Sequence, residues 1–299
     1  MRKKKRSVIS TIILILILLV GLSVMLYPTI SDWWNSKHQT RAIANYDKIV
    51  EEMDEDQTGE LLAQAYEYNN ALSSLSFPMA EYEKIQNYED VLNISGTGII
   101  GYIDIPTINV HLPIYHGTSE GVLNIAAGHL EGSTLPVGGI GTHAVISAHR
   151  GLPSAKLFSD LDQVYVGDTF TITVLNEVLT YEVEEIRIVL PNEIENLAIE
   201  KDKDLVTLMT CTPYGINSHR LLIRSHRVET IFPANVRVTA DAVLMDSLKV
   251  VPYIAAPFLL ALLIFWAISS HRRKRRIPWD NPLSIFDDNK AKSKKDGDS

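Results

Sequence analysis

The chain has 299 residues, of which 46% are hydrophobic and 21% are charged, so its composition excludes wholesale disorder. A single cysteine, Cys211, excludes an intramolecular disulfide. The formal net charge is −8, and the acidic excess lies in the middle of the chain, which argues against the basic face that nucleic-acid binding requires.

An uncharged apolar run covers residues 8–27 and follows a short basic N-terminus at residues 1–7. About 20 apolar residues are enough to cross the hydrocarbon core of a bilayer as a helix. A buried core helix is the alternative, but such a helix without a polar stripe is uncommon. Since no small-residue cleavage site follows, the run predicts a transmembrane anchor and not a cleaved signal peptide. Tyr27, Trp33 and Trp34 are expected at the membrane interface.

The next segment, residues 28–94, is predicted to be extracellular and helical. Apolar and aromatic side chains recur in steps of three and four through residues 43–53. Gly59 is expected to interrupt this helix, and Pro78 to end or break the helical run that follows it. Residues 69–77 are predicted to form a loop with apolar anchors.

From residue 95 onwards, short β-rich runs alternate with clusters of Gly, Pro and Asn, a pattern typical of an all-β barrel or sandwich. This predicted domain covers residues 95–232. Its strands are expected at residues 98–105, 111–115, 144–148, 169–175, 179–190, 205–210 and 221–227. Short helices are expected at residues 121–127 and 154–161.

A second uncharged apolar run covers residues 250–270, after a linker at residues 233–249 and before a basic tail at residues 271–299. The N-terminus carries five basic residues, and the tail carries nine basic and five acidic ones. Residues 28–270 therefore keep 14 basic and 31 acidic residues, a formal charge of −17. By the positive-inside rule both termini are cytoplasmic and the domain between them is extracellular. The sequence predicts a two-pass protein of the cell membrane.

Cys211 lies where a predicted strand meets a turn rich in Pro, Gly and Asn, a position that ligands can reach. A buried structural thiol is the competing interpretation. His219 and Arg220 follow the turn and are expected to return beside Cys211 on the next strand. A thiol with a pKa near 8.5 needs a base or a cationic neighbour to act as a nucleophile. Arg220 suits the stabilisation of an oxyanion, with an ordinary salt bridge as the alternative.

Two histidines are candidates for the partner of Cys211. His149 ends another predicted strand, at the same kind of position as Cys211, whereas His143 starts that strand and is expected at its opposite end. His219 lies across the turn, and spacing alone leaves His149 and His219 open. Because no cluster of His, Cys and Asp has the spacing of metal ligands, no cofactor or metal is predicted.

Several motifs between residues 95 and 230 resemble the sortases, the cysteine transpeptidases of Gram-positive bacteria. The run TLMTC at residues 207–211 is similar to the TLxTC signature of that family. Four further strings resemble its pilus-building class, class C: GYIDIP (101–106), LPVGG (135–139), SAHRGLPSAKLF (147–158) and CTPYGINSHRLLIRSHR (211–227). The resemblance implies a mainly β fold, an eight-stranded barrel with short helices, preceded by a helical lid segment and flanked by two transmembrane helices.

The resemblance also implies a reaction. Cys211 is expected to be the nucleophile, His149 the catalytic histidine in preference to His219, and Arg220 the arginine beside the oxyanion. The substrate is expected to be an LPxTG-like sorting signal, cleaved between Thr and Gly through a thioacyl-enzyme. The expected partners are pilin or surface proteins, with a pilin lysine amine as acceptor and an isopeptide bond as product. Two alternatives are the anchoring of surface proteins to a cell-wall peptidoglycan precursor and a non-catalytic, membrane-tethered binding module.

Class C sortases usually carry an Asp-Pro-aromatic tripeptide in their lid. The matching region here reads Leu75-Ser76-Phe77-Pro78 and has no aspartate before the proline. Phe77 is predicted to cap the site as an apolar lid residue. Packing of the helical segment onto the barrel is the alternative role for Phe77.

Overall fold

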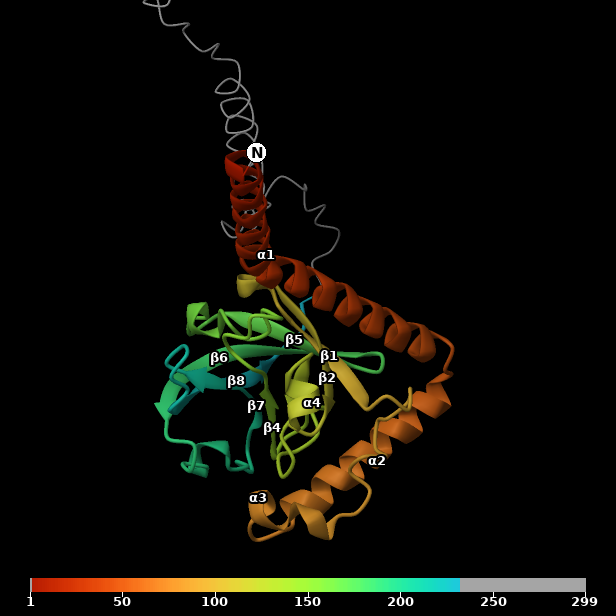
Figure 1. Cartoon of the computed structure of the whole chain (residues 1–299). Coiled ribbons are helices and arrows are strands. Elements are labelled where there is room, and N and C mark those ends of the chain that lie inside the picture. The colour runs from red at the N-terminus through yellow and green to blue at the C-terminus, as the bar shows by residue number, and fades with distance from the viewer. Residues whose placement is uncertain (1, 232–299) are drawn as a thin grey trace, which may run out of the picture. The chain divides into compact units, whose positions relative to one another are not determined.

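The structure is a computed structural model that describes residues 2–231, with side chains described from residue 12 onwards (Figure 1). The predicted linker at residues 233–249, the second apolar run at residues 250–270 and the basic tail at residues 271–299 lie outside the described residues.

Eight strands close into one barrel, in the order β1-β2-β3-β4-β7-β8-β6-β5 around its circumference (Figure 1). The strands are β1 (Ile99–Ile105), β2 (Val110–His116), β3 (Ala127–His129), β4 (Thr142–Ser147), β5 (Thr169–Val174), β6 (Glu177–Val189), β7 (Asp204–Thr212) and β8 (His219–Val228). The mainly β, eight-stranded barrel is thus confirmed. Each predicted strand is present within two residues of its expected bounds, and only the three-residue β3, too short to show an alternating pattern, was missed.

Two strand pairs are parallel, β2 with β3 and β4 with β7, whereas the other neighbours pair in antiparallel fashion. The β4–β7 pair has a consequence for chemistry. Parallel neighbours end at the same edge of a sheet, so the residues that follow β4 meet the C-terminal end of β7 and the start of β8.

Apolar side chains pack on both faces of the barrel wall. The interior contains large side chains such as Phe158, Phe170 and Tyr181, each about 1% exposed or less. Burial of one such side chain contributes roughly 2–3 kcal/mol. A second, smaller cluster lies on the opposite face of the wall, and we call it the outer apolar cluster: Val145, Val189, Leu197 and Leu222.

Two long helices precede the barrel and run along one side of it (Figure 1). α1 (Arg2–Glu51) is one continuous helix, and α2 (Glu55–Ser73) begins at the N-cap Asp54. The Asp54 side chain accepts from the Gln57 backbone while the Gln57 side chain accepts from the Asp54 backbone, a capping box that fixes the start of α2. The predicted break at Gly59 is therefore wrong, because Gly59 lies inside α2.

The short elements differ from the expectations in three places. Residues 69–73 are the last turn of α2 and not a loop, and Pro78 begins α3 (Pro78–Glu81), where its missing N–H costs nothing. The helix expected at residues 154–161 is replaced by turns. The remaining short helices are η1 (Tyr82–Lys84), η2 (Pro106–Ile108), α4 (Glu120–Leu123), η3 (Leu161–Gln163) and η4 (Glu195–Leu197).

The N-terminal half of α1 carries the first apolar run. Its side chains from Ile12 onwards are not buried by other parts of the protein, and it is the one helix among residues 2–231 that is long and apolar enough to cross a membrane. The second half packs on β1 and β2, where Ile43 and Tyr46 become buried.

Buried histidines give the fold a predictable response to acid. His129 is fully buried: its Nε2 donates to the Thr134 carbonyl, and its Nδ1 accepts from the Tyr88 hydroxyl, both at 2.8 Å. Burial lowers the pKa of His129 from 6.5 to about 4. Burial also lowers the pKa values of His116 and His143. All three side chains are therefore neutral in the folded state at neutral pH.

We expect the free energy of unfolding to fall as the pH decreases from 6.5 to about 4. In this window the unfolded chain binds a proton at His129 and the folded chain does not, so His129 alone accounts for a loss of roughly 3 kcal/mol. Urea unfolding at several pH values measures the slope, which His129→Asn should flatten. The control is His111→Asn, because the hydrogen bond that the His111 imidazolium donates to the Asp104 carboxylate raises the pKa of His111 and gives the opposite sign. Equal slopes for wild type and His129→Asn would contradict the assignment.

Candidate active site

Cys211 and Arg220 face each other across the β7–β8 pair. They are direct partners in the antiparallel register, so their side chains project from the same face of the sheet. Both residues are partly exposed. The Arg220 Nη1 donates to the carbonyls of Asn217 and His219, at 3.3 and 3.2 Å, and this keeps the guanidinium at the mouth of the β7–β8 turn.

The parallel β4–β7 pair brings His149 to the same place. Beyond the end of β4, the Ala148 N–H donates to the Met209 carbonyl at 3.2 Å, and the Thr210 hydroxyl donates to the Ala148 carbonyl at 2.8 Å. The next residue along this register is His149, which therefore lies beside Cys211.

The alternation of side chains decides which way His149 points. On β4, Ala144 and Ile146 belong to the interior core, as does Ala148 just beyond its end, whereas Val145 belongs to the outer apolar cluster. Since successive residues alternate, His149 follows Val145 to the outer face. Met209 packs against the same outer cluster, so Cys211, two residues further along β7, also points outward. We call the barrel end that carries His149, Cys211 and Arg220 the cysteine rim.

The three side chains thus lie at neighbouring positions: Cys211 on β7, Arg220 on β8, and His149 two residues beyond the end of β4. Neighbouring strands are about 4.8 Å apart. His219 does not join them. It pairs with Thr212 and so points to the opposite face from Cys211, and its Nδ1 lies 2.9 Å from the Ser218 hydroxyl. The register therefore separates the two histidines that spacing left open, and His149 is the one that shares a face with Cys211.

Contacts between two loops hold the cysteine rim together, and no local sequence pattern predicts them. Arg150, next to His149, forms an ion pair with Asp162, and its guanidinium carbon lies 5.8 Å from the centre of the Tyr214 ring. The Tyr214 ring also packs on Gly151, where an added Cβ would approach it to 3.0 Å. The loop after β4 and the turn after β7 are therefore packed on each other, which fixes His149 relative to Cys211.

The outer apolar cluster is covered by the segment before the barrel. Met79, in α3, packs against this cluster, and its Cα would lie 2.8 Å from a Cβ placed on Gly132. Gly132 has a φ of +85°, so a glycine is required there both by the backbone conformation and by the approach of α3. Phe77, the predicted lid residue, is 70% exposed, and Met79 two residues later makes the contact instead.

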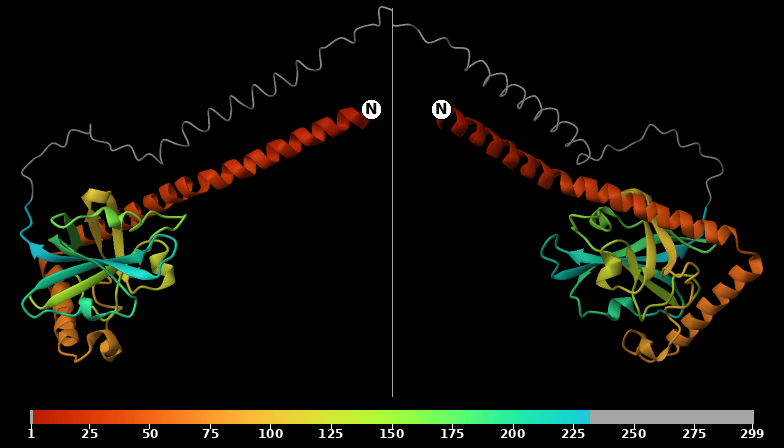
Figure 2. Two further views of the ribbon diagram at one scale, coloured as in Figure 1. Left: turned by 90° about the vertical axis from the view of Figure 1, so that its left-hand side faces the viewer. Right: turned by 45° about the vertical axis from the view of Figure 1, so that its right-hand side comes forward.

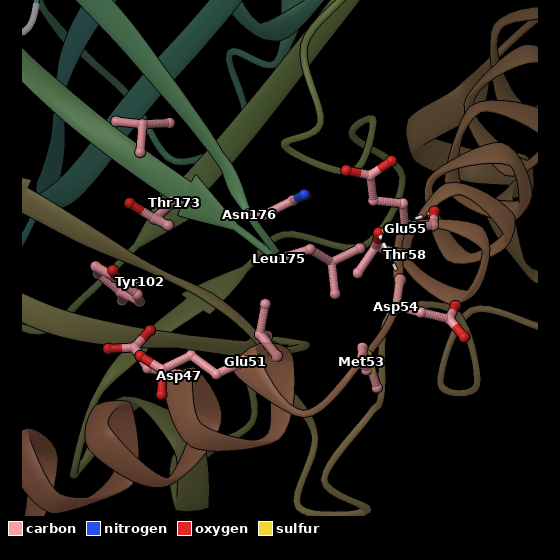
Figure 3. Close-up of a pocket in the computed structure, with 12 residues that line it drawn as sticks. Asp47, Glu51, Met53, Asp54, Glu55, Thr58, Tyr102, Thr173, Leu175 and Asn176 are labelled. Atoms are coloured by element: carbon pink, nitrogen blue, oxygen red, sulfur yellow. Dashed lines mark hydrogen bonds between the residues drawn. The ribbon is translucent and has the colours of Figure 1, made fainter.

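A pocket of about 520 Å³ lies away from these residues, between α1, α2 and the turn that joins β5 and β6 (Figure 3). Acidic side chains line it: Asp47, Glu51, Asp54 and Glu55. Burial raises the pKa of Asp47. This turn is at the opposite end of β6 from Val189, the partner of Arg220, so the pocket is remote from the cysteine rim. Within the described part of the chain, no three His, Cys, Asp or Glu residues are grouped to hold a metal ion.

A family model described as the Sortase domain matches residues 103–228, which include all three rim residues. Sortase C1 from Streptococcus agalactiae is 48% identical, with a TM-score of 0.58, and the match covers 64% of this chain and 100% of that one. The chain belongs to the sortase family. Members of this family are cysteine transpeptidases, and a half-exposed cysteine beside a histidine and an arginine is consistent with such chemistry.

Other sortases give similar matches. Sortase C from Streptococcus pneumoniae is 43% identical with a TM-score of 0.58, and the match covers 64% of this chain and 99% of that one. A lid mutant of sortase A from Corynebacterium diphtheriae is 45% identical with a TM-score of 0.56, and the match covers 60% of this chain and 97% of that one. Sortase A from Streptococcus agalactiae serotype III (strain NEM316) is 34% identical over 117 residues, 38% of this chain and 47% of that protein. The chain therefore spans about half the length of that curated relative.

Proposed function

We propose that this chain is a membrane-anchored sortase of the pilus-building class that joins pilin subunits through lysine isopeptide bonds. The observation that carries the proposal is the placement of His149, Cys211 and Arg220 side by side on one face of the cysteine rim. The likeness to sortase C structures, one of which is described in terms of pilin substrate specificity, supports the choice of class.

In the proposed reaction the Cys211 thiolate attacks the threonine carbonyl of an LPxTG-like sorting signal. Arg220 donates hydrogen bonds to the oxyanion of the tetrahedral intermediate. His149, as imidazolium, gives its proton to the departing glycine amine, which leaves a thioacyl-enzyme. A lysine amine of a second pilin then attacks the thioester and loses a proton to His149, so that the thiolate is released and an amide is formed.

The anchor of this enzyme is the N-terminal half of α1, and the proposed topology keeps both termini in the cytoplasm, with the barrel outside. Anchoring of surface proteins to a peptidoglycan precursor uses the same acyl-enzyme and differs only in the acceptor amine. A non-catalytic binding module is disfavoured by the shared face of the three rim residues, since a structural thiol needs neither neighbour.

The test is an acceptor competition. The full chain, in detergent, is incubated with an LPxTG peptide and equal amounts of an Nα-blocked lysine peptide and a cell-wall cross-bridge peptide with a free amine. We expect an acyl-enzyme mass adduct and a lysine-linked product. A product linked only to the cross-bridge amine would favour the cell-wall role, and the absence of any adduct, even in lid variants, would contradict the enzyme proposal.

We further propose that the segment around Pro78 is a lid and that Met79 is its apolar contact. Met79 occupies the outer face beside Leu222, which pairs with Met209, about 7 Å along the strand from Cys211. A sorting signal that binds along this face displaces Met79. The aspartate of the usual lid tripeptide is absent, so the lid is held by apolar packing and by the close approach at Gly132.

Met79→Ala is expected to raise the rate of peptide cleavage about fivefold, since loss of its packing removes roughly 1 kcal/mol from the closed state. Phe77→Ala is the matched control, because its ring is 70% exposed, and its rate should stay within a factor of about two of wild type. Cleavage of a fluorogenic sorting peptide measures both variants. A larger effect at Phe77 than at Met79 would assign the lid to Phe77.

A further inference from the structure

The first contact between α1 and the barrel comes soon after the apolar run. The run ends at Tyr27, and the Asp32 carboxylate accepts from the Lys156 N–H at 2.7 Å. One turn further, the Asn35 side chain donates to the Ser154 carbonyl at 2.8 Å. Five helical residues rise only about 7 Å, so residues 154–156 lie close to the end of the apolar run.

Residues 154–156 belong to the cysteine rim. They are part of the loop that starts at His149, and the Phe158 N–H closes this loop by donating to the His149 carbonyl at 3.1 Å. The Lys156 ammonium donates to the Ile108 carbonyl at 3.2 Å, in the turn between β1 and β2 at the same end of the barrel. The part of the barrel that α1 meets first is therefore the rim with the cysteine.

The other end of the barrel docks further along the helix. The Tyr46 hydroxyl donates to the Ile100 carbonyl and accepts from the Leu175 N–H, in the β5–β6 turn. Tyr46 lies 14 residues after Asp32, which corresponds to about 21 Å along the helix axis. In the left view of Figure 2, the cyan C-terminal end of β8, opposite its Arg220 end, lies on the side of the barrel away from the N-terminus of α1.

The two ends also differ in chemistry. Large apolar side chains are exposed at the cysteine rim: Tyr165 by 71%, Ile188 by 64%, Tyr214 by 63% and Ile216 by 72%. The remote end also exposes Ile140 and Ile231, so the difference between the two ends lies in aromatic side chains and in charge. Aromatic and apolar tips of this kind suit the interface of a bilayer. The remote end has the acidic pocket of Figure 3, with its four carboxylates, and such a surface favours water over a layer of anionic headgroups.

We propose that the cysteine rim faces the outer surface of the membrane and that the β7–β8 turn, with Tyr214 and Ile216, rests in the lipid headgroup region. This inference rests on the proposed anchor in α1. Docking in this way holds Cys211 at a fixed, short height above the bilayer. The sortase then accepts sorting signals presented at the membrane surface, and the acidic end of the barrel points away from the cell.

The test uses the full chain in nanodiscs that contain phosphatidylglycerol and phosphatidylcholine. Cys211→Ala removes the only cysteine and gives a background for single labels. Ile216→Cys places a fluorophore in the β7–β8 turn, and Asn176→Cys places one, as the matched control, in the exposed β5–β6 turn. With a spin label on the lipid headgroups, quenching should be at least about threefold stronger at position 216 than at position 176. Equal or reversed quenching would overturn the orientation.

Further outcomes distinguish failure of the anchor, of the orientation and of the lipid contact. Co-elution of the chain with the nanodiscs tests the anchor itself, so a chain that stays outside them removes the anchor of the proposed function together with the orientation. A chain that co-elutes with the nanodiscs but is quenched more strongly at position 176 than at position 216 contradicts the orientation alone. If the label at position 216 is shielded only after an LPxTG peptide is added, the turn is a substrate contact and the lipid contact is wrong.

Discussion

Cys211→Ala is expected to abolish acyl-enzyme formation and to lower turnover by a factor of at least about 10⁴, because neither neighbour supplies a replacement nucleophile. His149 lies beside Cys211 in the register of β4 and β7, and Arg220 opposes it on β8. In the proposed mechanism both act on the thiol or on the substrate oxyanion that its attack creates. Coexpression with candidate pilins gives the measurement: covalent ladders for wild type and none for Cys211→Ala.

The control for this variant is its stability. Cys211 is only partly buried, so loss of its sulfur should change the free energy of unfolding by less than about 1 kcal/mol. A second control is Met209→Leu, on the same face of β7, which keeps the apolar packing and should keep the ladders. Ladders that persist in Cys211→Ala would contradict the nucleophile assignment.

Much of the barrel follows from local pattern. The predicted strands are short β-rich runs between clusters of Gly, Pro and Asn, and each of them is present. The positions of Cys211 and His149 at strand ends follow from those bounds. The choice between His149 and His219 did not follow from spacing. It needs two registers. That of β7 with β8 places His219 opposite Thr212, and that of β4 with β7, which pairs residues 62 positions apart, brings the residues after β4 to Cys211.

The predictions that differ from the structure also have physical explanations. Gly59 was expected to break a helix, but a glycine costs a helix only about 1 kcal/mol, whereas the capping box at Asp54 fixes where α2 begins. Met79 was overlooked because its contact with the outer apolar cluster depends on tertiary packing near Gly132, 53 residues later. Phe77 is aromatic and, from the sequence, the more obvious lid residue than Met79, yet its side chain is the exposed one of the two.

Arg220→Ala is expected to lower kcat for peptide cleavage by about 10²–10³ with little change in KM, the signature of an interaction made in the transition state. In the structure the guanidinium uses Nη1 to hold two carbonyls of the β7–β8 turn, and among the described hydrogen bonds its other donors have no acceptor. Arg220 occupies the strand position opposite Cys211, beside the proposed site of the oxyanion.

Two matched variants decide whether Arg220 acts through its geometry or merely through its charge. Arg220→Lys keeps the charge but replaces the planar fork by a single ammonium, so it should recover only part of the lost rate. Lys203→Ala removes one positive charge just before β7, at the end of that strand remote from Cys211, and should leave kcat unchanged. Lys203 is also a positive charge on an acidic barrel. An equal loss of kcat in Lys203→Ala and Arg220→Ala would therefore assign the effect to net charge. Full activity of Arg220→Lys would show that a point charge suffices. A change in KM alone in Arg220→Ala would place Arg220 in substrate binding instead of oxyanion stabilisation.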